Sequence, residues 1–290
     1  MISYSNRYSK IRERLNHNEL VILDGGVGTE LQKRGIEMDE SWCGTASRNT
    51  EILKQVHLDY IKAGAQVITT NTYASSRLLL DAAGCGKDFE EINLKAISAA
   101  KAARDEVSDD ILIAGSLSHR YPIAHGDMQS NATIQFEQSV LQEATDEMAN
   151  FLSENGCDLI LLEMMYHPDR IQTVFESAKK TNKPIWAGFS TRRTENGDIL
   201  SLTDSVDVPF REIVKIIKDY ELDGKGIIYD DDGKIYQKGT FKDGELIKGI
   251  LYDENGNKDR SVGELPHQIS VKVAFTPIHD FLVERNKDFN

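Results

Sequence analysis

Five short apolar runs, each ending in polar residues, recur along the first two thirds of the chain. They read VILDGGVGTEL (21–31), VITTNTY (67–73), ILIAGSLSH (111–119), LILLEMM (159–165) and PIWAGFSTRR (184–193). A helix-like stretch follows most of them, and this alternation is typical of a buried parallel sheet in an α/β protein. Because crossovers between parallel strands are right-handed, all five strands are expected to run parallel. The rhythm stops after the fifth unit, near Tyr220.

The segments between the runs carry helical patterns. Residues 50–63 place apolar side chains on one helical face, and Gly64 follows as a C-cap. Helices are also predicted over residues 88–107, 131–155, 168–180 and 209–220, the last two beginning at prolines. Five such units do not close an eight-stranded barrel. The predicted fold class is therefore α/β, an incomplete TIM-type (β/α) barrel of about five parallel βα units.

Beyond Tyr220 the composition changes to short alternating runs with turn residues. GIIYDDDGK (226–234) and GILYDENGN (249–257) align at an offset of 23 residues. Turns of the DG type at close intervals predict a small antiparallel β-hairpin segment, which weakly resembles MORN repeats. We therefore expect a barrel portion over residues 1–220, hairpin repeats over 221–265 and a C-terminal tail over 266–290. The open barrel edges are expected to be covered by the hairpins or by a second chain, giving a homo-oligomer.

Charge and cysteine content exclude several classes of protein. The 290 residues carry 34 basic and 47 acidic side chains, a formal net charge of -13, which disfavours nucleic acid and anionic membrane surfaces as partners. No stretch reaches a membrane-spanning length, and the N-terminus has no apolar signal region. Three scattered cysteines suit a reducing compartment. The sequence predicts a cytoplasmic protein.

Candidate site residues stand at the carboxyl ends of the predicted strands, which converge on one face of the fold. They are Asp24, Asn71, Thr72, Ser116, His119, Glu163 and Ser190. Asp24 and Glu163 have no cationic neighbour in sequence. Since a buried carboxylate without a partner is costly, these two are expected to meet a cation such as a ligand amine. The alternative is a structural role, in which each accepts hydrogen bonds from loop amides such as those near Gly25, Gly26 and Gly28.

The ordered set LDGGVGTEL, VHLDYIKAGAQVITTNTY, AGS, DLILLEMM and PIWAGFS resembles the homocysteine S-methyltransferase family across about residues 19–218. That family is a (β/α)8 barrel that binds homocysteine and activates its thiol with zinc held by three cysteine thiolates. The resemblance implies that Asp24 and Glu163 hold the amino group and that Gly25 and Gly26 bring backbone donors to the amino acid. It also implies that Asn71, Thr72 and Tyr73 line the mouth of the pocket.

The chain departs from this family at the zinc ligands. The family has one ligand cysteine after strand six and an adjacent pair after strand eight, whereas this chain has only Cys43, Cys85 and Cys157. Zinc is the cofactor that the resemblance implies, but its ligands are missing. A substitute metal site could combine Cys43, His119 and His167, all in loops on the active face; isolated His and Cys residues are more often ordinary loop or core residues.

Two functions remain open from the sequence. The first is methyl transfer to the thiol of homocysteine, or a similar small thiol amino acid, giving methionine; by resemblance the donor is S-methylmethionine or S-adenosylmethionine. The second is a non-catalytic amino-acid-binding or assembly protein derived from the same family. Bound zinc and methionine formation would separate them.

Overall fold

The structure is a computed structural model that describes residues 5–17, 19–39, 41–122, 136–194, 196, 198–202, 207–218, 224–229, 235–242, 245–252 and 257–262. The chain divides into two compact units. The first contains Met1–Glu163 and Thr173–Trp186, and the second contains Met164–Gln172 and Ala187–Asn290. The predicted division near residue 220 stays a prediction.

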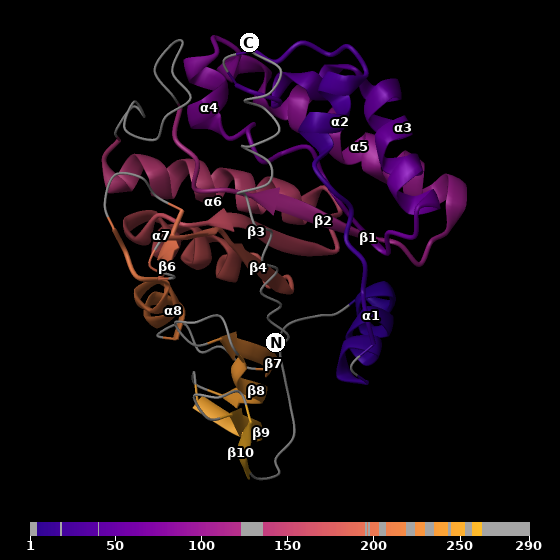
Figure 1. Cartoon of the computed structure of the whole chain (residues 1–290). Helices are drawn as coiled ribbons and strands as arrows, with labels where there is room; N and C mark the ends of the chain where they lie inside the picture. The colour runs from indigo at the N-terminus through magenta and orange to yellow at the C-terminus, as the bar shows by residue number, and fades with distance from the viewer. Residues whose placement is uncertain are drawn as a thin grey trace. The chain divides into compact units, whose positions relative to one another are not determined.

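A parallel sheet is the centre of the α/β fold (Figure 1). Its strands are β1 (Val67–Thr69), β2 (Leu112–Leu117), β3 (Leu159–Met165) and β4 (Ile185–Phe189), in the order β1-β2-β3-β4. Val67 pairs with Leu112 and Ala114 pairs with Leu159, both in parallel register. The sequential order follows from the crossover helices between the strands. The predicted α/β class with a parallel sheet is confirmed.

The first predicted strand, within residues 21–31, is shorter than expected. Leu23 forms only an isolated parallel bridge to Val67, and the Asp24 amide donates to the Val67 carbonyl at 3.0 Å. The sheet therefore has four strands and a bridge among the described residues, and the expectation of five full strands is wrong. The reason is local, because Gly25 and Gly26 follow at once and the helix α2 (Val27–Lys33) begins after them.

The fifth predicted strand, residues 184–193, is interrupted at Ser190. The segment β5 (Thr191–Arg193) leaves the parallel sheet and pairs antiparallel with β6 (Ile199–Ser201). Inside the second unit, the Ser190 amide donates to the Met165 carbonyl at 3.3 Å, and the Ser190 carbonyl accepts from Leu202. Ser190 therefore marks the change from the parallel sheet to a local hairpin.

Helices stand where the periodicity predicts them. The predicted ones are α3 (Thr50–Lys62), α5 (Phe89–Val107), α6 (Gln138–Glu154), α7 (Pro168–Lys180) and α8 (Phe210–Lys218). Residues 131–135 and 219–220 of the predictions lie outside the described residues. Further short elements are η1 (Thr45–Arg48), α4 (Arg77–Ala82) and η2 (Gly86–Asp88).

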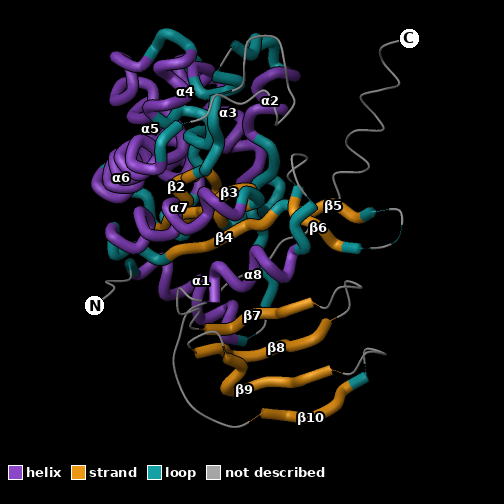
Figure 2. The backbone as a smooth tube through the Cα atoms, turned by 90° about the vertical axis from the view of Figure 1, so that its left-hand side faces the viewer, coloured by secondary structure: helices purple, strands orange, loops and turns teal. Residues whose placement is uncertain are grey.

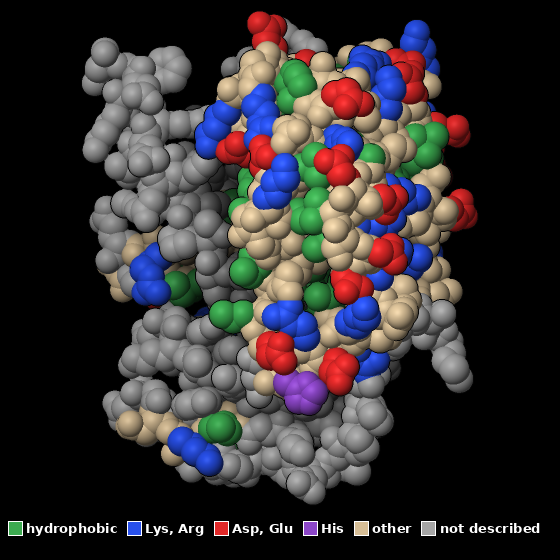
Figure 3. Space-filling model, turned by 90° about the vertical axis from the view of Figure 1, so that its right-hand side faces the viewer, with side chains coloured by type: hydrophobic (Ala, Val, Ile, Leu, Met, Phe, Trp, Pro, Cys, Tyr) green, Lys and Arg blue, Asp and Glu red, His purple; other side chains and the backbone are tan. Residues whose placement is uncertain are grey.

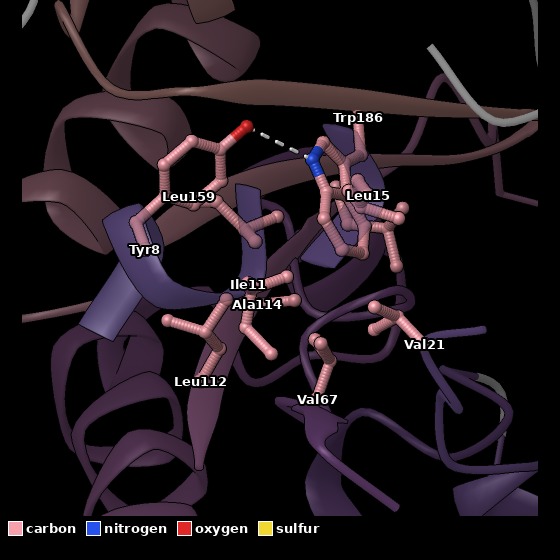
Figure 4. Packing of buried hydrophobic residues seen from close by; sticks show 10 residues of the cluster. Tyr8, Ile11, Leu15, Val21, Val67, Leu112, Ala114, Leu159 and Trp186 are labelled. Carbon is pink, nitrogen blue, oxygen red and sulfur yellow. Dashed lines mark hydrogen bonds between the residues drawn. The ribbon is translucent and has the colours of Figure 1, made fainter. Parts of the chain in front are cut away.

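An additional helix, α1 (Asn6–Asn16), begins the described chain. The Ser5 hydroxyl accepts a hydrogen bond from the Tyr8 amide at 3.2 Å, which caps the helix. Tyr8, Ile11 and Leu15 share one helical face and pack on the residues that open the strands. The cluster contains Tyr8, Ile11, Leu15, Val21, Val67, Leu112, Ala114, Leu159, Leu161 and Trp186 (Figure 4).

The second unit carries an antiparallel sheet of four short strands (Figure 2). They are β7 (Gly224–Tyr229), β8 (Ile235–Lys242), β9 (Glu245–Tyr252) and β10 (Lys258–Val262), in the order β10-β9-β8-β7. Gly226 pairs with Gly239, which pairs with Gly249 in the next strand. The predicted antiparallel hairpins are confirmed, whereas the resemblance to MORN repeats stays a prediction. Residues 263–290, which include the whole predicted tail, lie outside the described residues.

Two further features bear on possible partners: the apolar length of the helices, and the charges on the face drawn in Figure 3. Within those residues, no helix combines the length and apolar character that crossing a membrane requires. On the face in Figure 3, Lys and Arg side chains alternate with Asp and Glu side chains rather than gathering in one area. The predicted exclusion of nucleic acid and the predicted cytoplasmic location stay predictions.

Candidate amine-binding site

The interior face of the parallel sheet changes from apolar to polar along each strand. Alternate residues of a strand point to one face, so the face can be followed in steps of two. Along it stand Val67 and Thr69 in β1, Leu112, Ala114 and Ser116 in β2, and Leu159, Leu161 and Glu163 in β3. The polar members lie at the carboxyl ends of the strands, which is where parallel βα proteins bind their ligands. We call Asp24, Thr69, Ser116 and Glu163 the polar layer.

Asp24 is held by both polar groups of one threonine. Its Oδ2 accepts from the Thr69 amide at 2.7 Å, and its Oδ1 accepts from Thr69 Oγ1 at 2.8 Å. Burial raises the pKa of Asp24 to about 7, and the negative charge of Glu163 acts in the same direction. The two hydrogen bonds from Thr69 oppose this shift only in part. Asp24 is therefore near the midpoint of its titration at neutral pH.

Glu163 is held by the strand beside it. Its Oε2 accepts a hydrogen bond from Ser116 Oγ at 2.6 Å. Ser116 is itself fixed, because its amide donates to Thr70 Oγ1 at 3.1 Å and its carbonyl accepts from Thr72 Oγ1 at 2.8 Å. Burial raises the pKa of Glu163 above its usual range.

Neither carboxylate of the polar layer forms an ion pair with a Lys, Arg or His side chain among the described residues. Their charges act on each other, as the raised pKa of Asp24 indicates. Two carboxylates that share a poorly solvated site are stabilised by a cation, and a primary ammonium group offers three donors. The arrangement is chemically suited to binding an amine.

The glycines after Asp24 leave backbone exposed beside this layer. Gly25 and Gly26 are both exposed. A Cβ atom added at Gly25 would lie 2.8 Å from the Tyr60 hydroxyl oxygen, so a larger residue would displace that ring. The Tyr60 hydroxyl donates to the Gly26 carbonyl at 3.4 Å. That these glycines bring amides to a bound amino acid stays a prediction.

Asn71 and Thr72 are buried and brace the loops around the polar layer. The Asn71 amide group donates to the Cys43 carbonyl at 2.8 Å and to Ser47 Oγ at 3.0 Å. Tyr73 is partly exposed and meets the Trp42 ring edge to face, with centroids 6.1 Å apart. That Asn71, Thr72 and Tyr73 line the mouth of the pocket stays a prediction. The observed contacts of Asn71 and Thr72 hold neighbouring segments of the chain together.

The residues proposed as a substitute metal site receive no support. Cys43 is buried beside Ala74 and Leu79, and burial together with the charge of Glu163 raises the pKa of its thiol to about 12. His119 is fully buried, and His167 belongs to the second compact unit. In the part of the chain that the structure describes, no group of three or more His, Cys, Asp and Glu side chains could hold a metal ion.

The zinc that the family resemblance implies does not fit the residues present. All three cysteines lie among the described residues. Cys157 packs behind β2, where a Cβ atom added at Gly115 would lie 3.0 Å from its sulfur, and burial raises the pKa of its thiol to about 12. Cys85 precedes η2, where its sulfur is 3.9 Å from the Arg48 guanidinium. The three thiols are thus dispersed, and no step of a mechanism is assigned to zinc.

Sequence reasoning found both carboxylates and missed Thr69, the hydrogen-bond partner of Asp24. Asp24, Ser116 and Glu163 were expected at strand ends, and they do form one layer. Thr69 was not expected, although it is the last residue of β1 and lies two residues after Val67, a spacing that places both on one face.

Fold and geometry together define a parallel α/β protein with a candidate site at the carboxyl ends of its strands. The chain belongs to the homocysteine S-methyltransferase family, whose sequence model matches residues 21–226. Betaine--homocysteine S-methyltransferase 1 of Danio rerio is 29% identical over 180 residues, which cover 61% of this chain and 42% of that protein. Homocysteine S-methyltransferase of Escherichia coli is 24% identical over 220 residues, covering 72% of this chain and 69% of the relative.

A solved structure agrees with this assignment. The metallated form of the homocysteine methyltransferase MmuM from Escherichia coli matches with a TM-score of 0.59 and 25% identity, over 72% of this chain and 74% of that one. The chain thus has a fold neighbour of the TIM-barrel type. It spans less than half of the length of the Danio rerio relative.

Proposed function

We propose that this chain binds homocysteine, or a closely related thiol amino acid, through its α-amino group, and that it does not transfer a methyl group on its own. The observation that carries the proposal is the pair of carboxylates in the polar layer, each fixed by a hydroxyl and neither balanced by a protein cation among the described residues. A bound ammonium group supplies the missing charge.

Relatives support the class of ligand. Their names include homocysteine S-methyltransferase and, for Astragalus bisulcatus, selenocysteine methyltransferase, which is 26% identical over 224 residues. Both names describe an acceptor that is an α-amino acid with a thiol or selenol. The Danio rerio relative is named for betaine, a carboxylate-bearing onium compound, so donors of that class are the ones to test.

The second half of the proposal follows from thiol chemistry. A free thiol is mostly protonated at neutral pH and needs a metal or a base to become a strong nucleophile. The described residues offer no metal-binding group, and His57 in α3 is fully buried. Among the described residues, methyl transfer by this chain alone therefore lacks a metal site to activate the thiol, and we assign the carboxylates of the polar layer to the amine.

Calorimetric titration with reduced L-homocysteine tests the binding. The unmodified chain is expected to bind it, and 4-mercaptobutanoate, which lacks the amino group, is expected to bind at least ten-fold more weakly. Asp24→Asn and Glu163→Gln should each weaken homocysteine binding at least ten-fold, because each leaves the ammonium with one carboxylate. Asp59→Asn, an exposed aspartate on α3, is the matched control.

Proton release sharpens the same titration. Since a bound ammonium favours ionised Asp24, binding near pH 6 should release protons, visible as enthalpies that differ between buffers of different ionisation enthalpy. Equal affinities for homocysteine and 4-mercaptobutanoate would overturn the proposal of an amino-acid site. Methionine formation from S-methylmethionine with stoichiometric bound zinc would overturn the claim that the chain does not transfer methyl groups.

A further inference from the structure

Tyr60 of α3 is in contact with the two glycines that follow Asp24. We call Gly25 and Gly26 the glycine turn. The Tyr60 hydroxyl donates to the Gly26 carbonyl at 3.4 Å, and the same carbonyl accepts from the Glu30 amide of α2 at 3.2 Å. Tyr60 is partly buried and packs against the apolar cluster that α2, α3 and α5 share. The glycine turn is therefore held by a side chain whose own position is fixed by the packing of three helices.

The glycine at position 25 is required for space. Gly25 does not have a positive φ, so its backbone conformation is open to other residues. A Cβ atom added there would lie 2.8 Å from the Tyr60 hydroxyl oxygen and 3.1 Å from Tyr60 Cε1, and the first of these is closer than real Cβ contacts come. The contact between Tyr60 and the turn is thus close enough to exclude every other side chain at Gly25.

The amides of the glycine turn are available to a ligand. Gly25 and Gly26 are exposed, and among the described residues their backbone N–H groups donate no hydrogen bond. An α-amino acid whose ammonium group lies between Asp24 and Glu163 has its carboxyl carbon two bonds from that nitrogen, so the carboxylate reaches the residues next to Asp24. Both acidic side chains repel this carboxylate, and donors placed beside them decide whether it is tolerated.

Tyr60 keeps its proton at neutral pH. Burial raises the pKa of its hydroxyl above the usual range, and the negative charges of Glu30 and Asp24 act in the same direction. The hydroxyl is therefore a hydrogen-bond donor to the turn under ordinary conditions. The effect of Asp24 on this group also indicates that the hydroxyl lies near the polar layer.

We propose that Tyr60 is a positioning residue: by holding the glycine turn, it keeps the two free amides in place for the α-carboxylate of the bound amino acid. The site then prefers an amino acid to a simple amine because of Tyr60, although Tyr60 need not touch the ligand. The inference rests on the proposed function, since it concerns the same ligand. A purely structural link between α3 and α2, such as the exposed ion pair of Asp59 and Arg34 at 2.7 Å, would not change the choice of ligand.

The first test compares two ligands that differ only in the carboxylate. L-Homocysteine and 3-aminopropane-1-thiol have the same amine and thiol, and calorimetric titration should show that the unmodified chain binds homocysteine at least ten-fold more tightly. Tyr60→Phe keeps the ring and removes the hydroxyl. It should weaken homocysteine binding about three- to ten-fold, the range of one neutral hydrogen bond, and leave the affinity for 3-aminopropane-1-thiol unchanged. Asp59→Asn is the control and should change neither affinity.

The second test uses the close contact between Tyr60 and Gly25. Gly25→Ala should weaken homocysteine binding about ten-fold or more, because the added methyl group displaces the turn from the Tyr60 hydroxyl. Tyr60→Leu keeps an apolar side chain against the cluster and removes the hydroxyl end of the ring. In the Tyr60→Leu background, Gly25→Ala should cost less than about three-fold. Such a difference between the two backgrounds assigns the effect to this contact.

The outcomes separate this inference from the proposed function. If Tyr60→Phe changes neither ligand, or weakens both equally, Tyr60 does not position the turn for a carboxylate. The same conclusion follows if Gly25→Ala costs as much in the Tyr60→Leu background as in the unmodified chain. Homocysteine binding that depends on Asp24 but not on Tyr60 would overturn this inference alone. No binding of homocysteine by the unmodified chain would overturn both.

Discussion

The two ends of the parallel strands differ in chemistry although they belong to the same interior face. At the opening ends, Val67, Leu112 and Leu159 are fully buried among the apolar residues of α1. At the closing ends, the face presents hydroxyls and carboxylates that have their hydrogen bonds within the layer. A shift of two or four residues along one strand separates the two environments.

This difference separates the part of the sheet that stabilises the fold from the part where we propose that a ligand binds. Burying a large aliphatic side chain contributes roughly 1.5–3 kcal/mol, so the opening end stabilises the fold. Burying two carboxylates beside each other costs free energy, which a ligand cation can offset. Stability is therefore concentrated at one end of the sheet, and the proposed amine site lies at the other.

The largest expected effect comes from the apolar end. Leu159→Ala should lower the free energy of unfolding by about 2–5 kcal/mol, because it leaves a cavity between α1 and β3. Urea unfolding followed by circular dichroism measures this loss. Leu94→Ala, at an exposed leucine of α5, is the matched control and should change stability far less. If Leu159→Ala lowers the free energy of unfolding by less than about 1 kcal/mol, stability is not concentrated at the apolar end of the sheet.

The sequence predicted the elements of the fold better than their edges. Hydrophobic periodicity gave α3, α5 and α7 and the strand β3 closely, because each has many buried residues in a regular spacing. The length of the first strand was overestimated, because an apolar run does not reveal that Leu23 forms only an isolated bridge. The helix α1 was missed because its buried residues Tyr8, Ile11 and Leu15 are separated by charged residues, which are typical of a solvent-exposed segment.

The site was predictable as a set of residue types and not as contacts. Strand ends and burial cost were enough to pair Asp24 with Glu163 in one layer. The partners Thr69 and Ser116 depend on strand register, which short-range pattern does not fix. Cys43 was expected to reach the mouth, and its burial beside Leu79 became visible only from the packing of the loop after Asp24.

An intermediate effect is expected from Asp24, and it depends on pH. The folded pKa of about 7 lies above the ordinary value of 3.8, so between these values the folded state holds a proton that the unfolded chain has lost. This contribution to stability is fully present below about pH 4 and is lost as the pH rises toward 7. Because Asp24 is partly exposed, this contribution to the free energy of unfolding is about 1–3 kcal/mol.

Asp24→Asn should remove this part of the pH dependence. Urea midpoints measured from pH 4 to pH 8 without ligand should fall less steeply for the variant than for the unmodified chain. Asp110→Asn, which removes a surface pair with Lys10, should keep the original slope. The same slope in the Asp24 variant would mean that Asp24 does not retain its proton in the folded state.

The smallest effect tests whether polar contacts matter at the apolar end. Tyr8→Phe removes the hydroxyl that accepts from Trp186 Nε1 at 3.2 Å, so a buried indole N–H loses this acceptor (Figure 4). The free energy of unfolding should fall by about 1 kcal/mol. The wavelength of maximum tryptophan emission should change, because Trp186 loses this contact. Lys10→Ala, also on α1, removes an exposed ion pair with Asp110 and should cost less than about 0.5 kcal/mol. If the two variants lose equal stability, α1 is held by its surface charges as much as by its buried face, and the contrast between the two ends of the sheet no longer explains where stability resides.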